Sequence, residues 1–555
     1  MRLHLCCHCI AGILVTAGEA LSQETTRVSV RTNGGQANGH SYATAISPDG
    51  RYVAFGSFAT NLVNGDTNAK EDVFVHDRVT GVTERVSVDS SGAQGDKDSM
   101  GGSISGDGRI VGFVSHATNL VAGDTNGSPD TFVHDRSTGI TECVSVNTSG
   151  APGNNWSSTA SFSSDGRFVA FSSYSSDLVS NDTNGTSDIF LRDRQNGTTD
   201  LISIDSFGNQ ANGSSAWPVI SPNGTVITFA SAATNLVAGD TNGCTDVFVH
   251  DRFNGITERV NLDSTGNEGN GQSNFPQMSH DGQIIAFQSF ATNLDTRDNN
   301  GYNQDIYVHD RRSGVTELVS LSTSGSSGND ESRGPAGISA DGRFIAFVSF
   351  ASDLITNDTN NFEDFFVRDM VTGITERVSV DSSGNEGNWA SYGGGISANG
   401  ELVAFWSSSS NLVSNDTNNS VDSFVRDRCD AIWLNYGAGF SGTNGIPAFT
   451  AQSDPVLGST LTLDLDNSYG ATTVGLLLLG FARQESSTNR GGTLLVAPTF
   501  LIPMSVPAVG ASIAGTVPNA PALCDFTIDL QALELDPGAV NGVSFTPGLE
   551  LILGK

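Results

Sequence analysis

Carboxylate and amide side chains recur at a fixed spacing along the first three quarters of the chain. The stretch "DTNAKED" places Asp66, Asn68 and Asp72 at positions 1, 3 and 7. Oxygen ligands at alternating positions suit Ca²⁺, which takes six to eight of them. The same spacing recurs at Asp124, Asn126 and Asp130; at Asp182, Asn184 and Asp188; at Asp240, Asn242 and Asp246; at Asp358, Asn360 and Asp364; and at Asp416, Asn418 and Asp422. A further copy is one residue longer and contains Asp298, Asn300 and Asp305.

These loops also have a purely structural interpretation. A complete calcium loop carries an acid at position 5 and another further on, and both are missing here. Asp and Asn side chains also satisfy backbone amides in turns. Because a single ligand site should break the repetition, the presence of the pattern in every copy favours the structural role, and Ca²⁺ remains the alternative.

Other catalytic patterns are weak. His76, His134, His250 and His309 follow an apolar run, but Arg192, Arg368 and Arg426 take the same place in the other copies, which indicates a polar strand end rather than a metal ligand. The Gly-x-Ser-x-Gly elbow of α/β-hydrolases does not occur. We expect no catalytic residues.

The elements that position these residues repeat with a period near 58. A Ser-x-Asp/Asn-Gly turn recurs with its third residue at Asp49, Asp107, Asp165, Asn223, Asp281, Asp341 and Asn399. Each copy is typical of four short strands, as in "ATAIS", "RYVAFGS", "DVFVHD" and "TERVSV", which are rich in Val, Ile and Phe and bounded by Gly, Asn and Asp. Four-stranded units repeated around an axis form a β-propeller.

The ends of the repeat region predict how the ring closes. The last copy stops after "DSFVRDR" (422–428) and lacks its fourth strand, whereas "TTRVSV" at residues 25–30 is a fourth strand without a copy of its own. We therefore predict a seven-bladed β-propeller over residues 23–430, closed by pairing of residues 24–30 with 422–428.

The Asp-Gly turn, the apolar strand after it and the "DVFVHD" strand resemble the propeller repeats of TolB-like proteins and of the prolyl-oligopeptidase propeller, a WD-repeat-like architecture. The resemblance covers residues 24–428. It implies a binding platform or a lid, and the hydrolase domain of the oligopeptidases is not expected.

The loops that differ between copies are the better guide to a ligand. They carry Tyr42, Trp156, Trp217, Phe275, Arg333, Trp389 and Tyr392. Aromatic residues among Asp and Asn near a central channel suit sugars or peptides. The alternative is that several of these rings fill the spaces between blades.

The two ends of the chain differ from the repeats. Residues 1–22 have the polar start, apolar stretch and small-residue cleavage site of a secretory signal peptide. Residues 431–555 lose the period and predict a small C-terminal β-sandwich, with strands such as "TLTLDLD" (460–466). Cys429 and Cys524 are candidates for a disulfide at the domain junction, with two free thiols as the alternative.

The charge limits the partners. A formal net charge of −33 argues against nucleic acid, and no later segment is long enough to span a membrane. We expect a monomeric secreted, periplasmic or cell-surface protein, without a required cofactor, that presents a propeller face to a peptide, protein or glycan. The alternatives are a propeller enzyme, such as a lyase or a metal-dependent lactonase at the channel mouth, and a Ca²⁺-dependent adhesion module.

Overall fold

The fold is all-β over the residues that the structure describes. The computed structural model describes residues 24–158, 160–428, 432–436, 439–452, 455, 459–488, 492–517 and 527–554. It divides into two compact units, one of Thr25–Asp427 and one containing Arg428–Lys555. The predicted signal peptide, Cys429 and Cys524 lie outside the described residues. Within the described ranges, no helix is long and apolar enough to cross a membrane.

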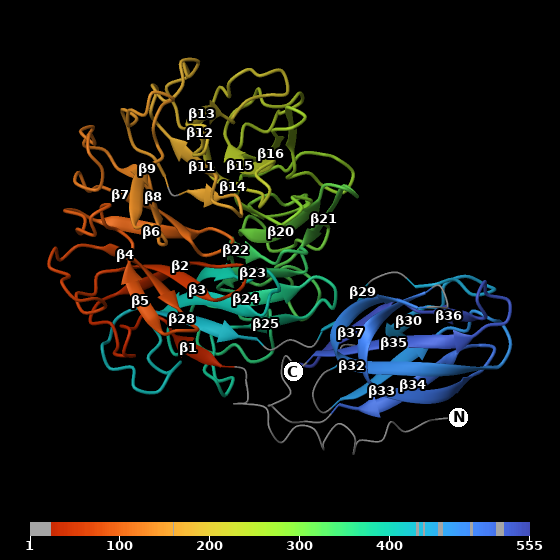
Figure 1. The fold of residues 1–555 in the computed structure, drawn as a ribbon. Helices are drawn as coiled ribbons and strands as arrows, with labels where there is room; N and C mark the ends of the chain where they lie inside the picture. Colours follow the sequence, from red (N-terminus) through yellow and green to blue (C-terminus); the bar gives the residue numbers. More distant parts are fainter. Residues whose placement is uncertain are drawn as a thin grey trace. The chain divides into compact units, whose positions relative to one another are not determined.

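The described strands of the first unit form seven four-stranded antiparallel sheets, which we number in chain order. Sheet 1 contains β2 (Ser41–Ile46), β3 (Tyr52–Ser57), β4 (Asp72–Asp77) and β5 (Val82–Arg85); sheet 2 contains β6 (Ser99–Ile104), β7 (Ile110–Ser115), β8 (Asp130–Asp135) and β9 (Ile140–Cys143); sheet 3 contains β10 (Ser161–Phe162), β11 (Phe168–Ser173), β12 (Asp188–Asp193) and β13 (Thr198–Leu201); sheet 4 contains β14 (Ser215–Ile220), β15 (Val226–Ser231), β16 (Asp246–Asp251) and β17 (Ile256–Arg259). Sheet 5 contains β18 (Ser273–Met278), β19 (Ile284–Ser289), β20 (Asp305–Asp310) and β21 (Val315–Leu318); sheet 6 contains β22 (Ser332–Ile338), β23 (Phe344–Ser349), β24 (Asp364–Asp369) and β25 (Thr375–Arg377); sheet 7 contains β26 (Ser391–Ile396), β27 (Leu402–Ser407), β28 (Asp422–Asp427) and β1 (Thr25–Arg27). The sheets follow one another around a ring in chain order, as in a β-propeller (Figure 1).

The recurring Asp-Gly turn determines where the first two strands of each sheet meet. In sheet 1, Ser47 Oγ donates to Asp49 Oδ1 at 2.5 Å, and Asp49 Oδ1 also accepts the backbone N–H of Arg51 at 3.0 Å. Gly50 has a φ of +70°, a conformation that glycine adopts without steric cost. The same bonds recur at Asp107, Asp165 and Asp341. The turn therefore sets the register of the following strand.

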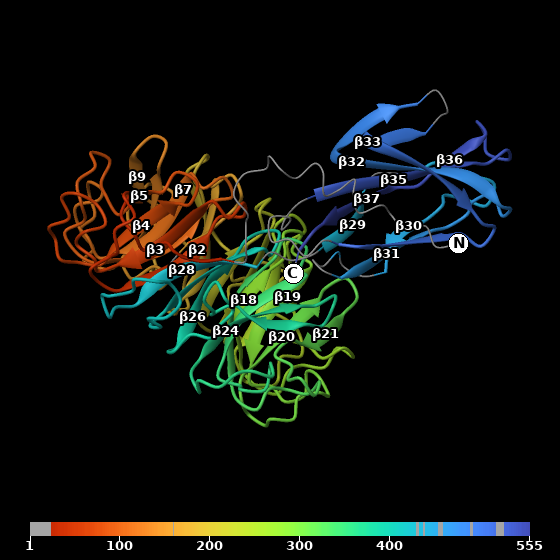
Figure 2. The ribbon, with the colours of Figure 1, turned by 90° about the horizontal axis from the view of Figure 1, so that it is seen from below.

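The predicted pairing of the N-terminal strand with the last sheet is present. Thr25, Thr26 and Arg27 pair antiparallel with Arg426, Val425 and Phe424. Both views show β28, at the end of the ring, beside β2 at its start (Figures 1 and 2). Ser29 Oγ donates to Asp422 Oδ1 at 2.7 Å, as Ser87 Oγ does to Asp72 Oδ1 at 2.6 Å in sheet 1.

Aromatic pairs form the core of each sheet. The ring of the second strand stacks on that of the third, as with Phe55 and Phe74 at 5.7 Å between centroids, and both are fully buried. The pair in sheet 5 is Phe287 and Tyr307, so one hydroxyl enters an otherwise apolar layer. These strands are buried on both faces because neighbouring sheets cover them.

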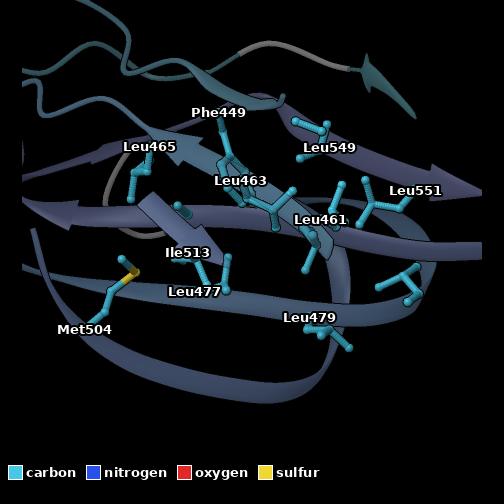
Figure 3. Packing of buried hydrophobic residues seen from close by; sticks show 14 of the residues in the cluster. Phe449, Leu461, Leu463, Leu465, Leu477, Leu479, Met504, Ile513, Leu549 and Leu551 are labelled. Atoms are coloured by element: carbon cyan, nitrogen blue, oxygen red, sulfur yellow. The ribbon is translucent and has the colours of Figure 1, made fainter. Parts of the chain in front are cut away.

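The second unit contains two described sheets around one core. One follows the order β29 (Ile432–Tyr436), β37 (Gly548–Ile552), β35 (Thr527–Leu535), β32 (Thr473–Ser487) and β33 (Thr493–Val506), with β36 (Val543–Phe545) paired to β35. The other contains β30 (Phe449–Ala451), β31 (Thr460–Leu465) and β34 (Ala511–Thr516). Leu461 and Leu463 of β31 and Leu477 and Leu479 of β32 point into the shared core (Figure 3). The alternation predicted for "TLTLDLD" is therefore present, with leucine inside.

Candidate functional site

The first strands of the sheets surround a cavity of about 1470 Å³. Residues from all seven sheets of the first unit line it. Small first-strand side chains such as Thr44 and Ser103, and the glycine at 394, alternate with larger ones in the lining and leave space between them. The larger side chains of the lining were predicted to lie on loops between sheets, but Trp217, Phe275, Arg333 and Tyr392 lie within first strands, and Trp156 alone of these five lies outside a strand.

Five of the seven predicted ligand residues line this cavity, namely Trp156, Trp217, Phe275, Arg333 and Tyr392. Tyr42 and Trp389 do not line it. The Tyr42 and Trp406 rings meet nearly at right angles with 5.2 Å between their centroids, and the centroids of Trp389 and Phe362 are 4.5 Å apart. The structure thus brings together most of the variable aromatic residues and separates Trp389 from the group.

Trp217 and Phe275 form the most unusual contact in the cavity wall. They come from adjacent sheets, and their ring centroids are 4.3 Å apart. Their φ angles are +54° and +52°, a left-handed region that bulky residues rarely occupy. Each lies where the register of the first strand shifts, between Ala216 and Val219 and between Asn274 and Gln277.

Other sheets fill the same strand position with small residues. Gly101 in sheet 2 and Gly334 in sheet 6 have φ angles of +73° and +31°. Sheets 1 and 7 have Ala43 and Gly393 there. The backbone bulge is therefore common to several sheets, whereas the large rings belong to sheets 4 and 5 alone among the described copies.

Two further aromatic stacks border the cavity. Trp156 stacks on Tyr174 at 5.7 Å, and both rings are more than two-fifths exposed. Tyr392 stacks on Trp406 at 4.2 Å. The sequence did not single out Tyr174 or Trp406, because both lie on or just after the second strand, whose residues were interpreted as core.

A charged group lies on one side of the cavity. Arg333 Nη1 is 3.1 Å from Glu363 Oε1, and Arg333 Nη2 is 2.8 Å from Glu331 Oε2. Glu363 is buried. Burial, together with a hydrogen bond to Glu363, raises the pKa of Tyr392 to about 12, so its hydroxyl stays a donor at neutral pH. This group offers an ordered set of donors and acceptors to a ligand.

Two glutamines were also missed from the sequence. Gln288 Nε2 donates to Gln304 Oε1, and Gln288 Oε1 accepts the backbone N–H of Gly334 at 2.6 Å. Gln288 occupies the place that holds Gly56, Val114, Ser172, Ala230, Val348 and Trp406 in the other sheets. Among the seven copies it alone has a long side chain with a polar end there, and this contrast was the available signal for a side chain in the cavity lining.

In each sheet, the two acids and the asparagine of the Asp-x-Asn loop form a cluster that we call the Asp-x-Asn frame. None of these residues belongs to the cavity lining. In sheet 1, Asn68 Nδ2 donates to Asp72 Oδ2 at 3.1 Å and to the Gly95 carbonyl at 3.0 Å. Arg85 Nη1 lies 3.5 Å from Asp66 Oδ1 and 3.2 Å from Asp72 Oδ2. A guanidinium thus takes the place between the two carboxylates where a cation would bind.

The same occupation is found in sheet 4. Among the described residues, Asp240, Asp246 and Glu268 form the one group of three or more Asp, Glu, His or Cys side chains whose ligand atoms lie close enough together to share a metal ion. Arg259 Nη1 is 3.6, 3.1 and 2.7 Å from their oxygens. In sheet 3, Gln210 Nε2 bridges Asp182 and Asp188 at 2.8 and 2.9 Å instead.

The histidines of the third strands are buried and bonded locally. Nδ1 of His76 is 2.8 Å from Thr83 Oγ1, and burial lowers the pKa of His76. His134, His250 and His309 make the same contact in their own sheets. These rings serve the packing between strands.

Comparison with known proteins gives structural neighbours only. No family model and no curated protein matches the chain. Among solved structures, a putative TolB from Agrobacterium tumefaciens is 16% identical, with a TM-score of 0.33, and covers 54% of this chain and 89% of its own. The WD40 repeats of RRP9 are 7% identical, with a TM-score of 0.38, and the match covers 74% of this chain and 99% of theirs. The periplasmic gluconolactonase PpgL of Pseudomonas aeruginosa is 16% identical, with a TM-score of 0.30, and the match covers 61% of this chain and 84% of its own. These identities and TM-scores are low, so the fold assignment rests on the strand pairing described above.

Proposed function

We propose that this chain is a secreted or periplasmic binding protein whose ligand enters the central cavity. In this proposal the first unit is a seven-bladed propeller closed by its N-terminal strand, and the second unit is a β-sandwich. The binding surface is the cavity wall made of the Trp156–Tyr174, Trp217–Phe275 and Tyr392–Trp406 stacks. Ligand recognition, rather than folding, explains why this wall differs from sheet to sheet.

The observation that carries the proposal is the backbone strain at Trp217 and Phe275. A bulky residue in the left-handed region costs about 1–3 kcal/mol, and such strain persists where function requires it. Glycine fits the same bulge without strain in sheets 2 and 6. Two adjacent rings are therefore held at the cavity at the expense of stability, which is unusual for side chains that only fill space.

The chemistry of the wall suits a glycan or an extended peptide. Partly exposed aromatic faces stack on apolar faces of ligands, and buried aromatic anchors commonly dominate binding energy. Gln288, Arg333, Glu363 and Tyr392 supply hydrogen-bond donors and acceptors next to those faces. The small first-strand residues leave room for a ligand to enter the channel.

The test is Trp217→Gly. Removal of the ring should weaken binding by about 2 kcal/mol, roughly 30-fold. The free energy of unfolding should change by less than about 1 kcal/mol, because relief of strain offsets lost packing. The ligand is found on glycan and peptide arrays with the wild-type protein, and binding is then measured by calorimetry.

Two matched controls accompany this variant. Trp389→Ala removes a tryptophan outside the cavity, and Phe207→Ala removes a ring that is 91% exposed. Both should bind like the wild-type protein. Normal binding by Trp217→Gly, or equal loss in Trp389→Ala, would contradict the cavity as the site.

One observation favours an enzyme as the second candidate. Arg333, Glu363 and Tyr392 form a buried acid with two donors at the cavity, a set that could act on a ligand held there. A lyase would use such a group. Glu363→Gln, assayed on any ligand that the arrays identify, distinguishes the two functions, because it would abolish turnover while binding persists.

A further inference from the structure

The Asp-x-Asn frame of sheet 5 differs from the others in what fills it. Sheets 1, 4 and 6 place the guanidinium of Arg85, Arg259 or Arg377 between the two carboxylates, with Nη1 3.1–3.6 Å from each. Sheet 7 places Arg27 near Asp416 and Asp422 at 3.8 and 3.4 Å. The frame is therefore built around a positive charge in four sheets.

Sheet 5 has lost both groups that fill the frame elsewhere. Leu318 stands at the position of the arginine, and Ser327 stands at the position of Gln210. Ser327 Oγ donates to Asn299 Oδ1 at 3.0 Å and does not reach the frame acids. Asp298 and Asp305 therefore lack the cationic or amide donor that their counterparts in sheets 1, 3, 4, 6 and 7 have.

Three oxygens of this frame are buried without a hydrogen-bond partner: Asp298 Oδ1, Asn300 Oδ1 and Asp305 Oδ2. Asp305 is fully buried. A buried carboxylate oxygen without a compensating partner is costly, and so is an orphaned amide oxygen. Within the described residues, no other sheet leaves its Asn oxygen free together with both acids.

The extra loop residue explains the free amide oxygen. In the other six sheets the frame asparagine accepts a backbone N–H two residues ahead, as Asn68 does from Lys70 at 3.0 Å and Asn360 from Phe362 at 2.7 Å. Sheet 5 has one more residue between its acids, and Asn300 Oδ1 has no such bond. Its Nδ2 still donates to the Gly328 carbonyl at 3.0 Å, which holds the side chain in place.

Tyr307 is a further change confined to sheet 5. It replaces the phenylalanine of the other third strands, and its hydroxyl donates to Asp298 Oδ2 at 2.7 Å. Ser320 Oγ donates to Asp305 Oδ1 at 2.6 Å. Each acid thus has one oxygen fixed by a neighbour and the other left open, an arrangement typical of residues that orient metal ligands.

We propose that Asp298, Asn300 and Asp305 bind one Ca²⁺ ion, which takes the place of the guanidinium in sheets 1, 4, 6 and 7. Carboxylate and amide oxygens are the ligands that Ca²⁺ prefers, and backbone carbonyls and water complete its coordination. Tyr307 acts as a positioning residue for Asp298. Sheet 2 also lacks the arginine, but Asn126 Oδ1 there is already bonded to the Ser128 N–H at 2.7 Å, so it offers fewer free oxygens.

The experiment titrates the EDTA-treated full chain with CaCl₂ by calorimetry in buffered salt near 150 mM, which screens the acidic surface. We expect one saturable site and a rise of the melting temperature with Ca²⁺. Asp305→Asn should weaken binding at least about tenfold. Asn300→Asp, which adds a carboxylate, should strengthen it.

The arginine-filled frames of the other sheets suggest the most discriminating variant. Leu318→Arg rebuilds the frame of sheets 4 and 6, so it should abolish Ca²⁺ binding while the Ca²⁺-free protein melts at or above the wild-type temperature. Asp364→Asn, in the arginine-filled frame of sheet 6, should lower the melting temperature and leave Ca²⁺ binding unchanged. The proposal is overturned if millimolar Ca²⁺ does not bind, or if Asp305→Asn and Asn300→Asp both bind like the wild-type protein.

Discussion

Glu71 is a residue whose ionisation should affect the stability of the protein near neutral pH. It precedes β4, and its backbone N–H donates to Asp98 Oδ1 at 3.1 Å. Burial first, and then the charges of Asp98 and Asp72, raise the pKa of Glu71 to about 7. The folded protein therefore binds this proton more tightly than the unfolded chain does.

The sign of the pH effect follows. The contribution of Glu71 to stability is complete below the ordinary glutamate pKa of about 4.5 and is lost as the pH rises through about 7. Glu71→Gln should therefore raise the melting temperature at pH 8 and change it little at pH 5. Glu317→Gln, at an exposed position on β21, controls for the loss of one negative charge. A gain that is the same at both pH values would contradict the prediction.

Single residues also mark the limit of inference from the sequence. The variable aromatic residues could be found by comparing repeats, but their directions could not. Trp217 lies at a bulge, and a shift of one residue in a strand turns a side chain to the other face. Trp389 comes two residues before β26 and packs on Phe362 instead. Only the backbone geometry separates these two tryptophans.

The fourth strand that arrives from the N-terminus is bonded like the internal fourth strand of sheet 1. Ser29 Oγ accepts the Ser423 N–H at 3.1 Å and donates to Asp422, and Ser87 Oγ accepts the Val73 N–H at 3.1 Å and donates to Asp72. The two serines are both fully buried. This match provides a direct test of how firmly the ring is closed.

Ser29→Ala and Ser87→Ala should each lower the free energy of unfolding by about 1–3 kcal/mol, because each leaves a buried carboxylate oxygen and a backbone N–H unpaired. Denaturant unfolding measures both. If the closing strand is as well formed as an internal one, the two losses should agree within about 0.5 kcal/mol. A negligible effect of Ser29→Ala beside a full effect of Ser87→Ala would show that the closing strand is frayed.

The strands could be predicted from the sequence because each strand pattern occurs in every copy of the repeat. The Asp-Gly turn, the apolar second strand and the missing fourth strand each predicted what the structure contains. The frame arginines were not recognised as partners of the Asp-x-Asn acids, because Arg85 follows Asp72 by 13 residues and pairing across strands brings them together. Such contacts depend on register rather than on local spacing.

The chain as a whole has two units with separate cores. The stacked aromatic pairs of the seven sheets lie in the first unit, whereas the second has its own cluster around Leu463, Leu477 and Leu530. Unfolding of one core need not unfold the other. We therefore expect two calorimetric transitions.

Two core variants assign these transitions. Leu477→Ala, at a side chain that is 1% exposed, should reduce the free energy of unfolding of the second unit by about 2–5 kcal/mol. The melting temperature of one transition should therefore fall while that of the other stays unchanged. Phe55→Ala, in sheet 1, should lower the melting temperature of the other transition alone. A single transition that both variants shift equally would show that the two units unfold together.

Closure by the first strand also has a consequence for the time course of synthesis. Thr25 and its partner Arg426 are 401 residues apart, so the partner is made last among the strands of the ring. At roughly 5–20 residues per second, the N-terminal strand waits about 20–80 s with its edge and Val28 uncovered. During that interval β1 can pair with the edge of another nascent chain, and a delay near residue 426 would favour exchange of this strand between molecules.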